Sequence, residues 1–363
     1  MKLVMTLLAR DEADIVDAQI AFHLNAGVDF VVATDNRSVD GTTEILERYE
    51  RAGYLHLIRE HGDDMRQGEW VTGMARLAAT DFAADWVINS DADEFWWPRG
   101  GSLKDVLATV PGRFGVVRGC WRHFVPRPDG GSCFAERMTI RLTKPAFAGD
   151  KRTIFHTHQK VAHRASPDVV IEAGNHYARG PGLDPLRAWH PIEVLHFSVR
   201  SVAQLERKGA GGWARNRDYI LAEHQLRLDD AARDRRLRVY FDSLAPSGDE
   251  LARGLADGTF VIDTRLRDAL RVLRRHDGTE NPLAFALPGS DAEVRLSFPR
   301  PDIDDEAAYA SEASALIDLD GIVRAESRVE AIEARIASLE DKRASRVIAR
   351  RSMRSLPYTE PPR

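Results

Sequence analysis

The sequence contains few features of secreted or membrane-spanning proteins. Its 363 residues include only two cysteines, Cys120 and Cys133, which excludes a fold held by several disulfides and favours two reduced thiols. No apolar run approaches the roughly 20 residues that cross a bilayer. The apolar start, residues 3–9, is interrupted at once by Arg10-Asp11-Glu12, so it predicts a buried strand rather than a signal peptide. We therefore expect a cytoplasmic protein with no transmembrane segment.

A dominant charge of one sign is also missing. Lysine and arginine total 51 against 56 aspartates and glutamates, which gives a formal net charge of −5. A surface this balanced has no general attraction for nucleic acid, so we expect no nucleic-acid partner and only local anion sites. The composition, 43% hydrophobic and 29% charged, is typical of a globular protein.

Strand and helix patterns alternate through the first hundred residues. Apolar runs predict strands at 3–9, 30–34, 54–58 and 85–89. Between them, helical periodicity appears at 14–25, 43–51 and 69–79. This alternation predicts right-handed crossovers and a mostly parallel sheet.

The pattern changes after about residue 115. Short strand-like segments at 116–118, 138–142, 169–171 and 192–195 are separated by glycine, proline and histidine. They predict a mixed or antiparallel second half, followed by a helix over 202–235.

The most informative segment joins a strand to a cluster of carboxylates. The apolar run 85–89 leads into Asp91, Asp93 and Glu94. Ligands of parallel sheets bind at the carboxyl ends of the strands. Three close negative charges repel one another unless a cation neutralises them, and oxygen-rich clusters suit Mg²⁺ or Mn²⁺. A solvated acidic turn is the alternative, but the preceding strand and the aromatic pair Trp96-Trp97 favour a metal site.

A second polar cluster follows the strand at 30–34. Asp35 and Asn36 stand where a carboxylate and an amide could pair with a base edge or a ribose hydroxyl. Arg10, at the end of the first strand, is expected at the same edge of the sheet. Asp40 is better explained as a local turn and helix-capping residue.

Four ordered segments resemble the family 2-like glycosyltransferases of the GT-A fold, in a bacterial branch of that family. The likeness covers roughly residues 1–225. The segments are Leu8–Ile15, Asp35–Thr42, Asp91–Phe95, and Leu195–Ser201 with the downstream Leu205–Lys208 and Gly211-Gly212.

This resemblance implies an α/β fold of the GT-A (Rossmann-like) type, with a mostly parallel central sheet flanked by helices. Residues 1–115 would form the nucleotide-sugar-binding half and residues 116–235 the acceptor-side half. Residues 236–363 lie outside the likeness, and their sequence predicts a mainly helical C-terminal extension with a short coiled coil and a basic tail.

The resemblance also implies an activity. The enzyme would transfer a sugar from a nucleotide-diphosphate sugar to a hydroxyl of a carbohydrate or lipid-linked acceptor, with Mn²⁺ or Mg²⁺ and with inversion. Bacterial cell-surface polysaccharide or glycoconjugate synthesis is the expected setting. The chain has Asp11 where asparagine is common before the glutamate, which leaves the details of the nucleotide contact open.

Site residues carry over from the family position by position. Asp93 would bind the metal directly, and Asp91 would contact the ribose, the metal or its water. His196 would complete the metal site, with His176 as the alternative. The nucleotide-sugar would contact Arg10, Glu12, Asp35, Asn36 and Asp91. Lys151 and Lys208 are not carried over from the family; from their place in the sequence they could reach its phosphates, although a solvated basic face explains the two lysines equally well.

Inversion requires a carboxylate base that the sequence does not single out. Glu136 is the first candidate, and Asp150 and Glu172 are alternatives. An isolated carboxylate of this kind is more often a surface residue than a base.

Two other classes of protein use similar clusters. A metal-dependent nucleotidyltransferase or phosphohydrolase could place Asp-X-Asp at a strand end, although the glycine-rich, lysine-bearing phosphate loop of some such enzymes is missing. A non-catalytic protein that binds nucleotide or carbohydrate is the second alternative.

The C-terminal region contains a short apolar seam in a charged background. Val329, Ile332, Ile336 and Leu339 recur at spacings of three and four residues. This predicts either self-association through residues 325–342 or a helix docked on its own domain. The arginine-rich end, residues 342–363, suggests peripheral contact with anionic lipid at the inner face of the membrane.

Overall fold

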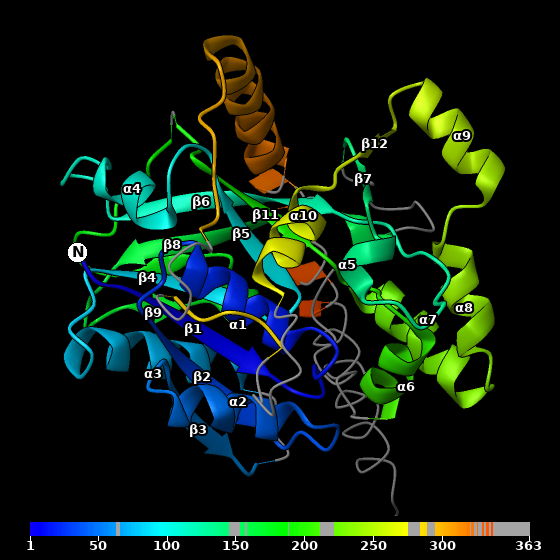
Figure 1. Ribbon diagram of the computed structural model, residues 1–363, viewed down its shortest axis with the longest axis horizontal. Coiled ribbons are helices and arrows are strands. Elements are labelled where there is room, and N and C mark those ends of the chain that lie inside the picture. The colour runs from blue at the N-terminus through cyan, green and yellow to red at the C-terminus, as the bar shows by residue number, and fades with distance from the viewer. Residues whose placement is uncertain are drawn as a thin grey trace, which may run out of the picture.

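We describe a computed structural model of the chain. The structure describes residues 1–62, 66–144, 153–156, 158–187, 189–210, 221–274, 284–288 and 295–319, and isolated helical residues between 321 and 336. A mixed α/β architecture surrounds one central eight-stranded sheet with the strand order β3-β2-β1-β4-β8-β6-β11-β5 (Figure 1).

The first half of the sheet is parallel and follows the predicted alternation. It contains β3 (Leu55–Glu60), β2 (Phe30–Asn36), β1 (Leu3–Ala9) and β4 (Trp86–Asp91), and each neighbouring pair is parallel. The connecting helices are α1 (Val16–Asn25), α2 (Thr42–Arg51) and α3 (Gln67–Thr80).

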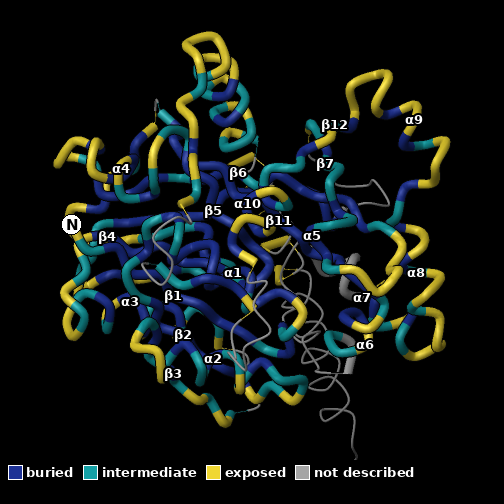
Figure 2. Tube along the Cα trace, in the orientation of Figure 1, coloured by how far each residue is buried: buried dark blue, intermediate teal, exposed yellow. Residues whose placement is uncertain are grey.

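The apolar sequence of β1 is explained by burial on both faces. All seven residues of the strand are buried. Leu3 and Met5 belong to the same apolar core as Ile20 of α1, whereas Val4 packs in a separate core with Met74 of α3. Because successive side chains point to opposite faces of a sheet, a strand covered by helices on both sides must be continuously apolar. Figure 2 shows the resulting buried centre.

The second half of the sheet is mixed. It contains β8 (Gln159–Arg164), β6 (Val116–His123), β11 (Ile192–His196) and β5 (Glu94–Pro98). β8 runs antiparallel to both β4 and β6, β11 runs parallel to β6, and β5 runs antiparallel to β11. The expected fold class, a mainly parallel central sheet flanked by helices, is confirmed. The strands β5 and β8 were not predicted.

The remaining elements lie outside the eight-stranded sheet, and their short strands pair as β10–β9 and β12–β7. Within the predicted helix 202–235, the described residues form α6 and α7. Further along the chain are more helices and one short strand, and no described helix has the length and apolar character needed to cross a membrane. The domain boundaries at 115 and 235 stay predictions.

The remaining elements are α4 (Leu103–Ala108), α5 (Phe134–Arg137), β7 (Ile140–Leu142), η1 (Thr153–Phe155), β9 (Val170–Ile171), η2 (Ala173–Asn175), β10 (Ala178–Arg179), α6 (Val202–Ala210), α7 (Leu221–Arg233), α8 (Leu237–Leu244), α9 (Gly248–Ala256), β12 (Phe260–Ile262) and α10 (Arg265–Leu273).

A buried glutamate joins the sheet to α10. Glu193 of β11 is 2% exposed and accepts hydrogen bonds from Arg122 Nε at 2.9 Å and Arg265 Nη1 at 2.5 Å. Burial alone would raise the pKa of Glu193, but Arg265 and Arg122 outweigh it and lower the pKa to about 2. The ionised glutamate therefore stabilises the folded chain.

We expect this pair of ionic contacts to appear in acid denaturation. The pKa of Glu193 is lower in the folded chain than the ordinary value of 4.5, so its stabilisation is present above pH 4.5 and is lost as pH falls toward 2. The linked loss is on the order of 3 kcal/mol. The free energy of unfolding, measured with urea at stepped pH, should therefore fall more steeply over this pH range for the natural chain than for Glu193→Gln. Equal slopes for the two chains would contradict this assignment.

Candidate active site

A pocket of about 230 Å³ opens at the carboxyl ends of the sheet strands. It lies where the first strand, β4 and β11 end, the position at which ligands of open α/β sheets bind. Its apolar wall is formed by Leu8, Ala92, Trp121, Ile154, Val199, Leu205 and Leu228. Its polar wall is formed by Arg10, Glu12, Gln67, Asp91, Asp93, His156, His196, Ser198 and Lys208.

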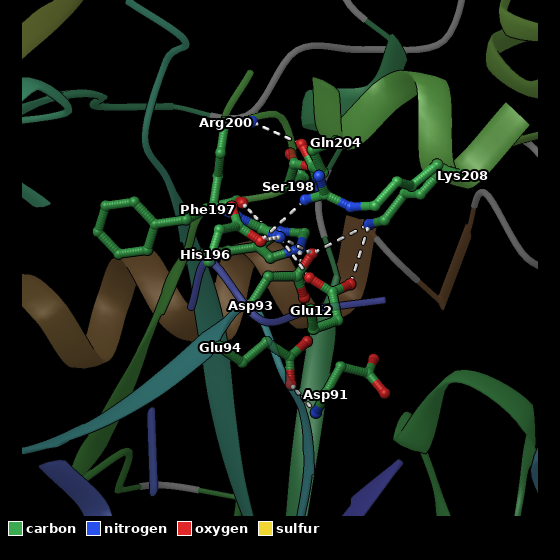
Figure 3. Close-up of polar contacts among 12 residues, drawn as sticks. Glu12, Asp91, Asp93, Glu94, His196, Phe197, Ser198, Arg200, Gln204 and Lys208 are labelled. Atoms are coloured by element: carbon green, nitrogen blue, oxygen red, sulfur yellow. Dashed lines mark hydrogen bonds and ion pairs between the residues drawn. The ribbon is translucent and has the colours of Figure 1, made fainter. Parts of the chain in front are cut away.

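Asp93 stands at the centre of the polar wall, in the turn between β4 and β5 (Figure 3). Its Oδ1 lies 3.7 Å from His196 Nε2, and its Oδ2 lies 3.6 Å from Lys208 Nζ and 3.8 Å from Arg200 Nη1. Burial alone would raise the pKa of Asp93, but the charges of Lys208 and Arg200 hold it well below its usual value. Asp93 is therefore an ionised carboxylate.

The protonation of His196 follows from a chain of hydrogen bonds. His123 Nε2 lies 2.7 Å from the carbonyl oxygen of His156, which can only accept, so this nitrogen carries the proton. Burial lowers the pKa of His123 and lowers that of His196 to about 3, so both rings are neutral. His123 Nδ1 is then an acceptor, and the nitrogen 3.2 Å away, His196 Nδ1, donates to it.

This chain leaves His196 Nε2 with a lone pair that faces the Asp93 carboxylate. Two electron-pair donors 3.7 Å apart with no proton between them fit a cation. A carboxylate with an imidazole is a donor set that suits Mn²⁺. In the described part of the chain, no three metal-ligating side chains converge, so oxygens of a ligand or water would complete the coordination.

Asp91 and Glu94 face a different cation, the buried Lys160 of β8. Lys160 Nζ lies 2.6 Å from Asp91 Oδ2 and 2.8 Å from Glu94 Oε1, and donates to the Gly174 carbonyl at 2.7 Å. Burial lowers the pKa of Lys160, but Asp91 and Glu94 raise it well above its usual range. Asp91, predicted as a metal ligand, also accepts hydrogen bonds from Asn175 and Gln67.

Glu94 is the more deeply buried of these two carboxyl groups. It is 0% exposed and accepts hydrogen bonds from Trp121 Nε1 at 2.8 Å and from the Asp91 amide at 3.1 Å. Burial, with Asp91 and Asp93 nearby, raises the pKa of Glu94 to about 8 despite Lys160. In the acidic motif, Asp91 and Glu94 therefore contact Lys160, whereas Asp93 faces His196.

Arg200 joins the N-terminal motif to this site. Its fully buried guanidinium donates to Glu12, to both carboxylate oxygens of Asp14 at 2.8 and 3.0 Å, and to the Phe197 carbonyl at 3.1 Å. Lys208 Nζ lies 3.6 Å from both Glu12 and Asp93. The predicted site residues Glu12, Asp93, His196 and Lys208 are therefore brought together.

Of the other predicted nucleotide contacts, Arg10 and Asp91 line the pocket, whereas Asp35 and Asn36 do not. Asp35 accepts hydrogen bonds from the Ser38 amide at 3.1 Å and the Thr43 hydroxyl at 2.5 Å, so it shapes the turn before α2. Asn36 is buried beside it. Asp40 accepts hydrogen bonds from the amide and the hydroxyl of Thr42 and so shapes the turn before α2, whereas Gly41 is the N-cap residue of that helix.

The remaining candidates are engaged elsewhere. Glu136 accepts hydrogen bonds from Arg271 at 2.9 and 2.5 Å, and that contact lowers its pKa. Glu172 forms an ion pair with Arg179 at 2.5 Å. His176 Nδ1 lies 2.7 Å from the Gln159 carbonyl, and its ring stacks on His158. Asp150 and Lys151 lie outside the described residues.

Sequence reasoning did not assign roles to Lys160, Arg200, His123 or Trp121. Arg200 belongs to the segment Leu195–Ser201 that carries the family resemblance, and this position was the signal that could have identified it. Lys160 and His123 could not be found from spacing, because they reach the site only through the pairing of β8 and β6 with the rest of the sheet.

The chain is therefore an α/β protein with a pocket at the edge of its sheet. Asp93 and His196 are the candidate cation ligands of this pocket, and Arg10 and Lys208 are its candidate anion-binding residues. Residues 6–113 match the family model described as glycosyltransferase family 92. This segment contains Arg10, Glu12, Asp91 and Asp93 but not His196 or Lys208. No curated protein matches the chain.

Solved structures offer distant similarities. TarS residues 1–349 of S. aureus in complex with UDP-GlcNAc is 13% identical, with 66% of this chain and 73% of that chain covered and a TM-score of 0.34. Glucosyl-3-phosphoglycerate synthase from Mycobacterium tuberculosis, in complex with Mn²⁺, UDP and glucosyl-3-phosphoglycerate, is 19% identical, with 35% and 45% covered and a TM-score of 0.24. The aligned part therefore spans less than half of the mycobacterial enzyme.

We expect removal of the buried lysine to destabilise the site. Lys160→Met leaves Asp91 without its counter-ion and Glu94 without a hydrogen-bond donor, at a cost of about 3–5 kcal/mol in unfolding free energy. Adding Asp91→Asn to this variant should restore part of the loss, because it removes the carboxylate that has lost its counter-ion. The measurement is urea denaturation of both variants.

Lys104→Met is the matched control for this experiment. Lys104 pairs with Asp29 where both side chains are 33% exposed, so its loss should cost about 1 kcal/mol or less. If Lys160→Met is no more destabilising than Lys104→Met, the lysine does not hold the acidic motif.

Proposed function

We propose that the protein is a glycosyltransferase that moves a sugar from a nucleotide-diphosphate sugar to an acceptor hydroxyl. The observation that carries the proposal is the Asp93–His196 pair, a carboxylate and an imidazole lone pair facing each other beside Lys208. The match of residues 6–113 to glycosyltransferase family 92 supports the same class.

In this proposal Asp93 and His196 hold Mn²⁺ or Mg²⁺. The bound ion supplies a positive charge that stabilises the negative charge developing on the departing diphosphate. Lys208, 3.6 Å from Asp93, and Arg10 in the pocket wall bind and orient phosphate oxygens. Arg200 keeps Glu12 and Asp14 in place, and His123 keeps the proton off His196 Nε2.

The finer features stay proposals. They are membership of the family 2-like branch, the GT-A type of fold, inversion, and a carbohydrate or lipid-linked acceptor. Glu136 is not proposed as the base, because it is held by Arg271 on α10 and does not line the pocket. Asp150 remains a candidate from the sequence.

The division of the chain needs one refinement. Residues 1–115 are proposed to bind most of the donor and 116–235 the acceptor, but His196 and Lys208 from the second segment complete the donor side. Cytoplasmic location, contact with the inner face of the membrane, and a role in cell-surface polysaccharide or glycoconjugate synthesis remain part of the proposal.

The first test removes the charge of Asp93. With a panel of nucleotide sugars and Mn²⁺, we expect the natural chain to release nucleoside diphosphate and Asp93→Asn to lose at least about 100-fold of that turnover, since a neutral amide binds a divalent ion poorly. Asp242→Asn, at an exposed carboxylate of α8, is the control and should keep full activity.

Two outcomes would argue against the proposal. Wild-type turnover in Asp93→Asn would remove the assigned ion site. Release of pyrophosphate instead of nucleoside diphosphate would indicate nucleotidyl transfer.

The second test concerns His123. His123→Phe removes the acceptor for His196 Nδ1, so His196 is free to carry its proton on Nε2. This nitrogen then has no lone pair to offer to a metal ion beside Asp93. The Mn²⁺ concentration for half-maximal turnover should rise about 10- to 100-fold, as for other residues that orient metal ligands. Turnover at saturating Mn²⁺ should recover, which a general loss of folding would not allow.

His163→Gln is the matched control for the second test. His163 is also fully buried, but it hydrogen-bonds the Arg164 carbonyl and does not line the pocket. An equal shift in Mn²⁺ dependence for both variants would show that the effect is unspecific.

A further inference from the structure

Lys208 is held less tightly than Lys160 and Arg200, the two other cations that face the acidic cluster. Its Nζ lies 3.6 Å from Glu12 Oε1 and 3.6 Å from Asp93 Oδ2, so both contacts are ion pairs longer than a hydrogen bond (Figure 3). The side chain extends from α6 and is 25% exposed. It lines the same pocket as both carboxylates.

Lys160 and Arg200, in contrast, are fixed in place. Arg200 is fully buried and donates to the two carboxylate oxygens of Asp14 at 2.8 and 3.0 Å. Lys160 is 1% exposed and donates to Asp91 at 2.6 Å. Turning either cation away would leave a carboxylate of the protein interior without its partner, which is costly. Of these three cations, Lys208 can therefore leave its partners most easily.

The position of Lys208 opposes the binding of a divalent cation. The proposed ligands of that cation are Asp93 and His196, and the Lys208 ammonium faces one oxygen of the same Asp93 carboxylate. A cation on Asp93 and the ammonium would therefore share one carboxylate. Two positive charges this close repel each other, and the repulsion is stronger in a pocket that is largely shielded from water.

A diphosphate removes this repulsion. Its oxygens carry negative charge, which attracts an ammonium and a divalent cation alike. Lys208 can then turn from Glu12 and Asp93 to the phosphate oxygens and leave the carboxylate to the cation. The diphosphate would thus improve the binding of the cation, and linkage requires that the cation improve the binding of the diphosphate by the same factor.

We propose that Lys208 makes the binding of the divalent cation depend on the diphosphate. Without a diphosphate, its ammonium stays between Asp93 and Glu12 and weakens the binding of the cation. With a diphosphate, it binds phosphate, and the cation and the nucleotide enter the pocket as a pair. The inference rests on the proposed function, to which it adds this coupling and the residue that carries it.

The test measures the binding of Mn²⁺ alone to the full chain, by electron paramagnetic resonance of the free ion. Lys208→Met keeps a long side chain without the charge, so it should bind Mn²⁺ about 10-fold more tightly than the natural chain. Lys208→Arg keeps the charge and should bind Mn²⁺ as weakly as the natural chain does.

The coupling is measured by calorimetry with a nucleoside diphosphate, the tightest binder among UDP, GDP, CDP, ADP and dTDP. Saturating Mn²⁺ should tighten the binding of this nucleotide, and the factor should be about 10-fold smaller in Lys208→Met than in the natural chain. The complex of Mn²⁺ with the nucleotide in solution is the same for both chains and cancels in this comparison.

Arg207→Met is the matched control. Arg207 precedes Lys208 on α6, but it pairs with Asp14 at 3.4 Å and Asp40 at 3.5 Å and does not line the pocket. Its loss removes the same charge from the same turn of helix and should change the affinity for Mn²⁺ by no more than about twofold.

The outcomes separate this inference from the proposed function. Equal Mn²⁺ affinities of Lys208→Met and the natural chain, or a similar gain in Lys208→Arg or Arg207→Met, would overturn the inference and leave the ion site in place. No Mn²⁺ binding by any of the chains, or binding that Asp93→Asn does not weaken, would overturn the proposed ion site and this inference with it.

Discussion

The arrangement of this protein depends on neutralising carboxylates that the chain buries at one edge of its sheet. Glu12, Asp93 and Glu94 are nearly or fully buried there, with Asp91 beside them. Uncompensated charges of this kind are costly in a protein interior. The cations come from distant segments: Lys160 from β8, Arg200 from the loop after β11, and Lys208 from α6. Electrostatic pairing therefore ties the second half of the chain to the first.

The carboxylates are not compensated in the same way, and the difference separates two roles. Asp91 and Glu94 are held by a buried lysine that solvent cannot replace. Asp93 instead faces a neutral imidazole, a half-buried Lys208 and the buried Arg200, and it is the carboxylate that we propose as the ligand of an exchangeable cation. A motif that is one cluster in sequence therefore has two electrostatic environments in space.

The sequence predicts the parallel half of the fold well, because β1, β2 and β4 are apolar runs with local signals at each boundary. It also predicts that Glu12, Asp93, His196 and Lys208 belong to one site, through motifs. It could not predict β5, whose residues read as part of the acidic site, or β8, whose Lys160 and His163 give it a polar sequence. Both strands are stabilised by partners far along the chain, which no local pattern reports.

Trp121 shows why the second half of the sheet had to be seen to understand the site. Its ring stacks on His196 at 4.2 Å between centroids, its Nε1 donates to Glu94, and Lys160 Nζ lies 5.1 Å from its centre. It therefore contacts Glu94, which pairs with Lys160, and also His196, which faces Asp93. Arg122, the next residue on β6, pairs instead with Glu193 and Glu312, as the alternation of a strand requires. One strand thus holds the candidate site and anchors the helix of residues 303–319.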